Sequence, residues 1–336
     1  MLKSHQYGKL LTGLKIKVVP LAAESLGVRS MCTYVETPDL GILIDPGVSL
    51  GFRFGLLPHP KEYQAIKAAR NRLAQYAEAS SILTISHYHN DHATPSFTDY
   101  TWNFSDPDVA EQLYEGKTIL AKDYRNAINP SQRKRGWIFK ERLENIAKSF
   151  EPADGCGFRY GKTTLNFSKP VPHGELGTQL GWVLMLSVRY DNDVFVHASD
   201  IQGPIVRDTV DKLLKEKPDI VYLGGPPTYL TDYRIREDTI SMAFCNMSRV
   251  VENVPTVIVD HHLMRQGALH QGFEKVLSTG IQTGHLVLTA AEFLKTENSF
   301  LESRRKELYD EYPPSKEFIE WTKLAEERRM STFPPA

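Results

Sequence analysis

Apolar and polar residues alternate along the chain in a way that predicts short strands and intervening helices. Apolar runs of four to six residues, often β-branched and bounded by Gly, Pro or polar residues, are typical of buried strands. The clearest runs lie at 14–19, 31–36, 41–45, 81–85, 163–167, 193–200, 219–223 and 256–260. Longer segments with apolar residues at helical spacing and no internal glycine predict helices. The main ones lie at 60–79, 207–216 and 236–252.

Composition places the chain among ordinary globular proteins. It has 336 residues, of which 41% are hydrophobic and 24% are charged. The formal net charge of −1 creates no global field that would attract nucleic acid or an anionic membrane, although a local basic patch would suffice. No repeat or low-complexity linker divides the chain, so we expect a single domain over 1–336.

Neither a membrane anchor nor a disulfide framework is indicated. No apolar run approaches the roughly 18 residues of a membrane span, and the N-terminus lacks the apolar core of a signal peptide. We therefore expect a cytoplasmic protein without a membrane partner, and the sequence leaves its oligomeric state open. The cysteines, Cys32, Cys156 and Cys245, form no Cys-x-x-Cys pair, and we expect all three to be buried small hydrophobes.

The most informative stretch is Ser-His-Tyr-His-Asn-Asp-His at 86–92, directly after the strand predicted at 81–85. His87 and His89 are two residues apart, so they point to the same side of an extended backbone. Asp91 and His92 follow after a turn and can reach a second point nearby. Nitrogen and oxygen donors in this arrangement suit a pair of divalent metals, and imidazole favours Zn, Fe or Ni. A polar loop with chance histidines is the alternative, but it explains a lone histidine better than this string.

Five further polar residues lie at or after the end of a predicted strand. Asp45 ends the strand at 41–45, where an aspartate could simply cap a turn. His173 lies between Pro and Gly in a tight turn, and Asp200 ends the strand at 193–200. His261 and His262 follow the strand at 256–260.

The string at 87–92 and the order of these motifs resemble the metallo-β-lactamase-fold hydrolase superfamily, within it a mainly archaeal branch of predicted hydrolases. The resemblance implies an α/β fold, a four-layer αββα sandwich with a dinuclear metal site at one edge. It implies that one metal is bound by His87, His89 and His173, the other by Asp91, His92 and His261 (or His262), with Asp200 as the bridge. Asp45 would orient a ligand imidazole. Zinc is the favoured metal, with iron or manganese as alternatives.

The function implied by this resemblance is hydrolysis by a hydroxide bound to two cations. Asp91 would steer the hydroxide or accept its proton, and His262 is a candidate substrate or proton-transfer group. The target is a phosphodiester or a carboxylic ester, lactone or thioester, and the low net charge favours a small-molecule or nucleotide substrate. A di-iron redox enzyme and a non-catalytic metal-binding protein are the alternatives. Arg265 could bind an anionic substrate group or form a surface ion pair.

Residues 97–160 are expected to include a substrate-selecting insertion. Its helix at 131–150 is rich in Lys and Arg, with Trp137 and Phe139 among them. Such a pattern can bind a phosphate backbone, but we favour a solvated helix face with buried aromatics.

A mostly helical, highly charged segment is predicted at 292–329. Glu302 and Arg305 are expected on its solvated face. Three apolar residues at helical spacing should pack against the body of the protein: Phe318, Trp321 and Leu324.

Overall fold

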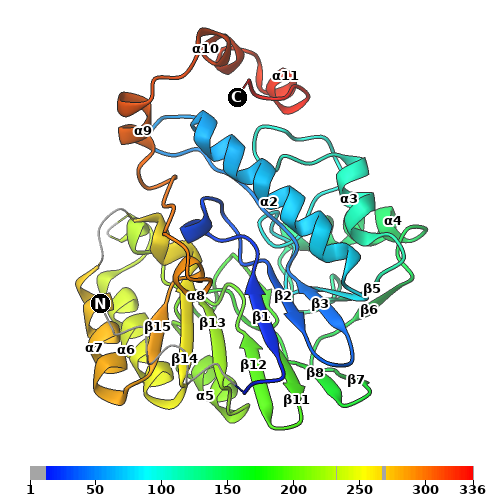
Figure 1. Cartoon of the computed structure of the whole chain (residues 1–336), viewed down its shortest axis with the longest axis vertical. Coiled ribbons are helices and arrows are strands. Elements are labelled where there is room, and N and C mark those ends of the chain that lie inside the picture. Colours follow the sequence, from blue (N-terminus) through cyan, green and yellow to red (C-terminus); the bar gives the residue numbers. More distant parts are fainter. Residues whose placement is uncertain (1–12, 232, 267–269, 336) are drawn as a thin grey trace.

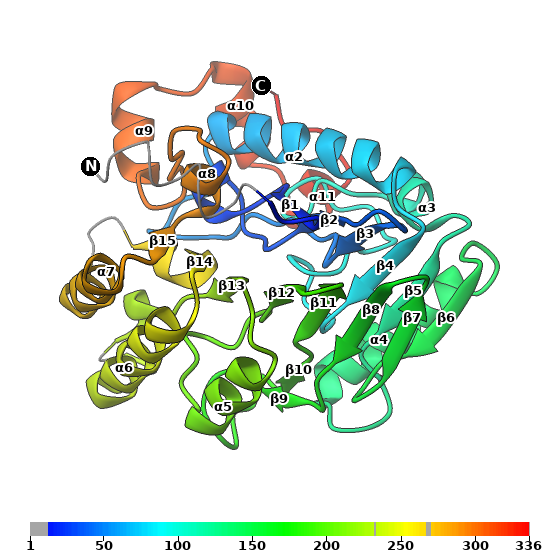
Figure 2. The same cartoon turned by 60° about the horizontal axis from the view of Figure 1, so that its bottom comes forward.

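Two β-sheets pack face to face, with helices on both outer faces (Figures 1 and 2). The computed structural model describes residues 13–231, 233–266 and 270–335. Figure 2 shows the four layers in turn, from α2 through the first and second sheets to α5 and α6. This arrangement confirms the αββα sandwich that the sequence led us to expect.

The first sheet contains six strands in the order of the chain. They are β1 (Lys17–Pro20), β2 (Thr33–Glu36), β3 (Gly41–Ile44), β4 (Ile82–Ile85), β5 (Thr118–Ala121) and β6 (Ser149–Pro152). β1 to β3 are antiparallel, and β3 to β6 are parallel. The parallel strands are joined by α2 (Pro60–Glu78), α3 (Pro107–Tyr114) and α4 (Pro130–Leu143). Consequently β3, β4 and β5 all end at one edge of the sheet.

The second sheet has seven strands in the order β15-β14-β13-β12-β11-β8-β7. They are β7 (Gly157–Tyr160), β8 (Thr163–Phe167), β11 (Leu186–Tyr190), β12 (Asp193–His197), β13 (Ile220–Gly224), β14 (Thr256–Asp260) and β15 (Leu286–Leu288). β12 to β15 are parallel, so they also end together. Their connections contain α5 (Arg207–Lys215), α6 (Glu237–Asn253) and α7 (Gln271–Thr283).

Short elements complete the edge where these strands end. A two-stranded ribbon pairs β9 (Val171–Pro172) with β10 (Trp182–Val183). Single turns of 3₁₀-helix are η1 (Glu24–Leu26), η2 (Thr228–Leu230) and η3 (His261–Arg265), and α8 (Ala290–Phe293) follows β15.

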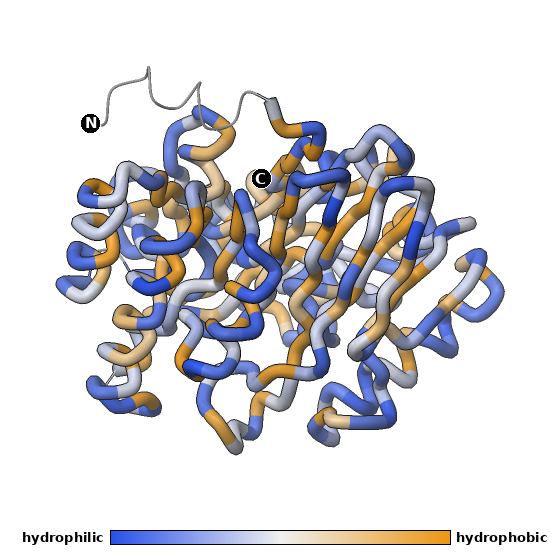
Figure 3. The backbone as a smooth tube through the Cα atoms, turned by 90° about the horizontal axis from the view of Figure 1, so that it is seen from below, coloured by the Kyte–Doolittle hydropathy of each residue, from blue (hydrophilic) through white to orange (hydrophobic). Residues whose placement is uncertain are grey.

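Three hydrophobic cores hold the layers together. Ile42 and Ile44 of β3 point into the core between the sheets, whereas Leu43 points into the core beneath the outer helices. Alternate residues of one strand thus enter two different cores, which explains why the strands are apolar at nearly every position. Along the outer helices, hydrophilic and hydrophobic residues recur at short intervals (Figure 3). This pattern is expected when one face of a helix is buried. Among the described residues, no helix is both long and apolar enough to span a membrane.

The segment 97–160, predicted to include an insertion, is built into both sheets. It supplies β5 and β6 to the first sheet and β7 to the second. Its helix α4 lies against the histidine motif through Gly136, where an added Cβ would stand 2.5 Å from Cε2 of Tyr88. A glycine is therefore needed for α4 to approach the motif this closely.

Three side chains expected in the interior are exposed, so those predictions were wrong. Trp137 is 52% exposed, while Phe139 two residues later is buried, because successive residues of a helix face different directions. Cys156 precedes β7 in a turn and Cys245 lies on the outer face of α6, and both are exposed. Cys32 is buried as expected.

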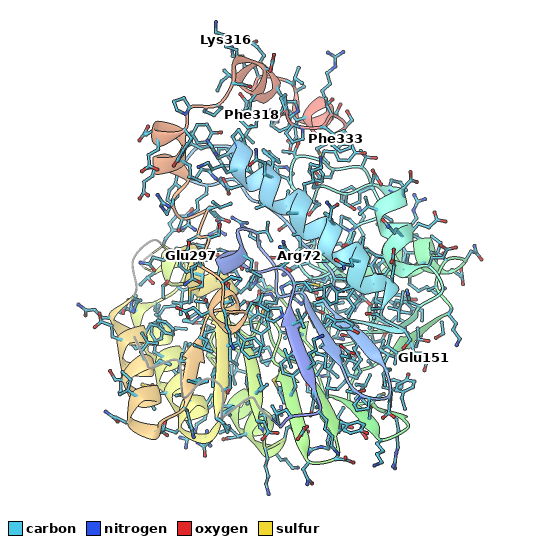
Figure 4. The ribbon with its side chains drawn as sticks, in the orientation of Figure 1. Arg72, Glu151, Glu297, Lys316, Phe318 and Phe333 are labelled. Atoms are coloured by element: carbon cyan, nitrogen blue, oxygen red, sulfur yellow. The ribbon has the colours of Figure 1, made fainter. Side chains whose placement is uncertain are left out.

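The C-terminal segment passes around the N-terminal end of α2 (Figure 1) and contains three short helices. They are α9 (Arg305–Glu311), α10 (Lys316–Thr322) and α11 (Glu326–Met330). Phe318 lies between α10 and α2 (Figure 4), and Phe318 and Trp321 both pack on Tyr63. These contacts confirm that the apolar residues of this segment pack against the body.

Arg305 and Glu302, expected in solvent, are instead buried, and that prediction was wrong. Arg305 has no exposed side-chain surface and pairs with the equally buried Glu62 of α2 through two contacts of 2.8 Å. It also donates to the carbonyl oxygens of Gly51 and Leu56. A charge pattern alone cannot reveal these partners, because they lie about 240 positions earlier in the chain.

We expect Arg305→Met to destabilise the protein by about 3–5 kcal/mol, because it leaves the Glu62 carboxylate buried without a counter-charge. The matched control is Arg304→Met, whose exposed side chain pairs with Glu307 at the surface and should contribute less than about 1 kcal/mol. Urea unfolding of both variants measures the difference. Equal unfolding midpoints would show that the buried pair does not anchor this segment.

Candidate metal centre

The polar residues singled out in the sequence meet at the edge of the sandwich where the parallel strands end. Asp45 follows β3, and the string from His87 to His92 follows β4. His173 follows β9, and Asp200 comes shortly after β12. His261 and His262 open η3 at the end of β14. The structure therefore brings all of these candidates together, from five separate parts of the chain.

Three imidazoles form the first cluster. His89 Nδ1 lies 3.1 Å from His87 Nε2 and 3.3 Å from His173 Nε2. Burial and the neighbouring imidazoles lower the pKa of His87 well below its ordinary value and that of His89 to about 3. Both rings are therefore neutral, which is the form that binds metal. These three nitrogens could hold one ion.

Asp91, His92 and His261 form the second cluster, in which one donor atom from each residue lies within 4.8 Å of the others. Nε2 of His92 and Nε2 of His261 are buried and have no hydrogen-bond partner in the described part of the chain. A buried polar atom without a partner is costly, and a cation between these nitrogens would satisfy both. The two rings thus fit a metal ion.

Asp200 lies between the two clusters. Its Oδ2 is 3.1 Å from His173 Nε2 of the first cluster and 3.3 Å from His261 Nε2 of the second. Its Oδ1 is buried without a partner among the described residues. Although burial alone would raise it, His262 and His173 hold the pKa of Asp200 well below its ordinary value. An ionised carboxylate at this position can contact ions in both clusters.

Asp45 fixes the orientation of His92. Its Oδ1 accepts a hydrogen bond from the Ser86 amide at 2.7 Å, and its Oδ2 lies 2.9 Å from His92 Nδ1. With Nδ1–H donated to Asp45, the lone pair of His92 is left on Nε2, which faces the second cluster. Ser86 Oγ lies 3.0 Å from His87 Nδ1 and can act in the same way on the first cluster.

Glu24 of η1 has the corresponding role for His261, and the sequence did not reveal it. A carboxylate oxygen of Glu24 lies 3.1 Å from His261 Nδ1. Burial alone would lower the pKa of His261, but Glu24 and Asp200 raise it to about 10. Two carboxylates that attract a proton to this ring also attract a metal cation. A signal was present, because Glu24 is the one acidic residue in an apolar stretch from 18 to 28.

Arg265 is buried rather than at the surface. It is 4% exposed and pairs with Glu24 at 2.7 Å, and it lies 3.5 Å from Asp91 Oδ2. Arg265 therefore positions the carboxylate that contacts His261. The surface ion pair suggested by the sequence was wrong, because the pair is buried. The alternative role, binding an anionic substrate group, stays a prediction.

Three strands end here in a backbone conformation that non-glycine residues rarely adopt. Asp45 after β3, Ser199 after β12 and His261 after β14 have φ angles of 48°, 59° and 63°. Left-handed backbone at such residues costs of order 1–3 kcal/mol each and is concentrated at functional sites. At His261 this turn directs the ring inward, toward the second cluster.

His262 lies on the more open side of the centre. Its Nε2 is 3.0 Å from Asp200 Oδ2, and its Nδ1 is 2.8 Å from the Tyr229 hydroxyl. Its side chain retains 13% exposure, whereas that of His261 is fully buried. Asp200, His261 and His262 together could also hold an ion. Both histidines therefore face Asp200, one from inside the protein and one from the solvent side.

The chain has relatives among known proteins, although no family model matches it. It is 41% identical over 297 residues to the UPF0282 protein MK0213 of Methanopyrus kandleri, covering 88% of this chain and 100% of that protein. It is 43% identical over 295 residues to the UPF0282 protein MJ1629 of Methanocaldococcus jannaschii, covering 87% and 96%.

Among solved structures, the chain is similar to Tm1679, described as a metal-dependent hydrolase of the beta-lactamase superfamily. The TM-score is 0.44 at 14% identity, covering 82% of this chain and 95% of that one. The extent of identity to the archaeal relatives, over nearly the whole of both chains, shows that this protein belongs to the UPF0282 family.

Proposed function

We propose that the protein is a hydrolase that uses two divalent cations. The observation that carries this proposal is the position of Asp200 Oδ2, within 3.3 Å of imidazole nitrogens from both clusters. One ion would be held by His87, His89 and His173, the other by Asp91, His92 and His261, with Asp200 shared. When bound, the cations supply hydroxide at neutral pH and polarise the oxygen of the bond that is attacked. Zinc suits this donor set best, and iron or manganese are alternatives.

Asp91 is the group that we assign to proton transfer at the centre. His92, His261 and Arg265 lower its pKa against the effect of burial, so it is ionised at neutral pH. Its side chain keeps 18% exposure, so solvent can reach it. An ionised carboxylate there can orient water by accepting its hydrogen bond and can take up its proton.

His262 is suited to relay a proton toward solvent. Burial lowers its pKa to about 4, so the ring is neutral. The neutral ring that matches its neighbours donates Nε2–H to Asp200 and accepts the Tyr229 hydroxyl at Nδ1. His262 therefore connects Asp200 to Tyr229 and can pass a proton between the metal centre and the partly exposed phenol.

The low net charge of the chain supports a small-molecule or nucleotide substrate. A recess of about 90 Å³, open to solvent, is lined by Tyr88 and Asn90 of the histidine motif. Its other walls are mainly apolar, with Ala93, Pro95, Phe97, Ile138 and Phe139. We propose a phosphodiester or a carboxylic ester, lactone or thioester as the substrate.

We expect wild-type protein to bind two ions per chain and to hydrolyse bis(p-nitrophenyl) phosphate or p-nitrophenyl butyrate when loaded with Zn, Mn or Fe. The Asp200→Asn variant should lose at least one ion, and its turnover should fall at least a hundredfold. The reason is that a neutral amide binds cations more weakly than the shared carboxylate does. Metal content by plasma emission and release of p-nitrophenolate are the measurements. Asp208→Asn, at an exposed position of α5, is the matched control.

An Asp200→Asn variant that keeps both ions and full turnover would refute the dinuclear hydrolase. Oxygen consumption by the iron-loaded protein, without hydrolysis of either ester, would instead favour the di-iron redox alternative.

The carboxylates behind the ligands can be tested separately. Glu24→Gln and Asp45→Asn should each weaken metal binding about 10–100-fold, because an amide orients the imidazole without its negative charge. Competition with a fluorescent chelator measures the affinity. Glu36→Gln, at a half-exposed position on β2, should leave it unchanged. If all three variants bound metal alike, the orienting role of these carboxylates would be wrong.

A further inference from the structure

A strained turn lies beside the metal centre, in the loop between β3 and α2. The backbones of Arg53 and Leu56 exchange hydrogen bonds across a two-residue turn formed by Phe54 and Gly55. Both central residues have positive φ, 58° at Phe54 and 75° at Gly55, as a type I′ turn requires. Glycine tolerates this conformation, but a bulky phenylalanine rarely does. Retention of such strain points to a function for the side chains that the turn presents.

The guanidinium of Arg53 contacts two aromatic rings. Its central carbon lies 4.8 Å from the ring centroid of Phe54 and 4.8 Å from that of Tyr229. These two cation–π contacts hold the planar group in place, while its N–H donors remain available for other partners. The side chain retains 15% exposure. Arg53 is therefore a rigid, accessible donor.

Arg53 is less completely paired than the arginines around it. Glu302 is bound by Arg29 through two short contacts of 2.6 and 2.7 Å. Arg265 contacts Glu24 at 2.7 Å and Asp91 at 3.5 Å. Arg53 has a single, longer contact of 3.3 Å to the already occupied Glu302. Most of its N–H donors therefore have no partner among the described residues.

This guanidinium is connected to the metal centre through Tyr229 and His262. Tyr229, on which Arg53 stacks, places its hydroxyl 2.8 Å from His262 Nδ1, and His262 Nε2 lies 3.0 Å from Asp200. Arg265 also donates to the Tyr229 hydroxyl, at 3.3 Å, which holds the ring in place. The ring of Tyr229 and the imidazole of His262 therefore lie between Arg53 and Asp200.

We propose that Arg53 is an anion-binding residue of the substrate site, and that the substrate carries a carboxylate or phosphate group a few bonds from the bond that is cleaved. The proposal rests on the hydrolytic function proposed above and narrows its substrate class to esters with a second, negatively charged end. A planar guanidinium binds carboxylate and phosphate oxygens through paired hydrogen bonds. The exposed ring of Phe54 beside it offers an apolar surface to the chain that links the two ends.

The test uses dicarboxylates of four to seven carbons and their monoamides as probes of the zinc-loaded protein, measured by titration calorimetry. One carboxylate can reach the metal centre and the other Arg53, whereas the monoamide lacks the second charge. We expect one chain length to bind at least tenfold more tightly than its monoamide. Arg53→Gln should abolish this preference, and Arg53→Lys, which keeps the charge without the planar fork, should retain part of it.

Arg159→Gln is the control, because this exposed arginine of β7 lies near the turn at Gly161, at the opposite end of the sheet from the metal centre. It should leave the preference within twofold of wild type. A purely structural role for Arg53 would weaken the binding of both probes equally, and this result would overturn the proposal. So would the absence of a preference at every chain length.

Binding and turnover separate this inference from the function on which it rests. If the protein hydrolyses the nitrophenyl esters but Arg53→Gln keeps the dicarboxylate preference, the anion site is refuted and the hydrolase stands. If the preference depends on Arg53 but neither ester is hydrolysed under any metal, the anion site stands and the hydrolase is refuted.

Discussion

Burying ionisable side chains is expensive unless each has a partner, and this protein buries at least seven of them at one point of its sandwich. The arrangement around them follows from that cost. Carboxylates stand behind the imidazoles of the second cluster, and imidazoles surround Asp200. After this pairing, the buried atoms that still lack a hydrogen-bond partner among the described residues include His92 Nε2, His261 Nε2 and Asp200 Oδ1. Bound cations would satisfy these atoms.

The same constraint explains how distant parts of the chain are joined. Asp260, at the end of β14, accepts hydrogen bonds from the amides of Ser25, His261 and Ala290. One buried carboxylate thereby fixes η1, η3 and α8 relative to one another. Burial and the nearby Glu24 raise the pKa of Asp260 to about 6. The position of His261 therefore depends on residues from the first tenth and the last fifth of the described chain.

The sequence was sufficient where the signal is local. The string at 87–92 is contiguous, and Asp45, His173, Asp200 and His261 each occur where a predicted strand ends, so their meeting follows from the parallel order of the strands. The strands themselves were predictable because those buried on both faces are apolar at nearly every position.

The sequence was insufficient where a side chain depends on a distant partner. Glu24 and His261 are 237 positions apart, and Arg305 and Glu62 are 243 apart. The local pattern marks Glu24 as an isolated acidic residue but does not show its partner, and it gives no sign of the pairing of Arg305. Arg265 and Arg305 consequently looked like surface charges, although both are buried. Arg53 was missed for a similar reason, because its incomplete pairing is visible only when Arg29 and Glu302 are brought beside it.

The pair of Glu62 and Arg305 also bears on when the first sheet can be covered during synthesis. Glu62 lies in the helix that covers this sheet, whereas Arg305, its only buried counter-charge among the described residues, is made 243 positions later. Until position 305 is synthesised, α2 cannot bury that carboxylate together with its counter-charge. The helix and the sheet beneath it therefore reach their full stability only after that position has been made.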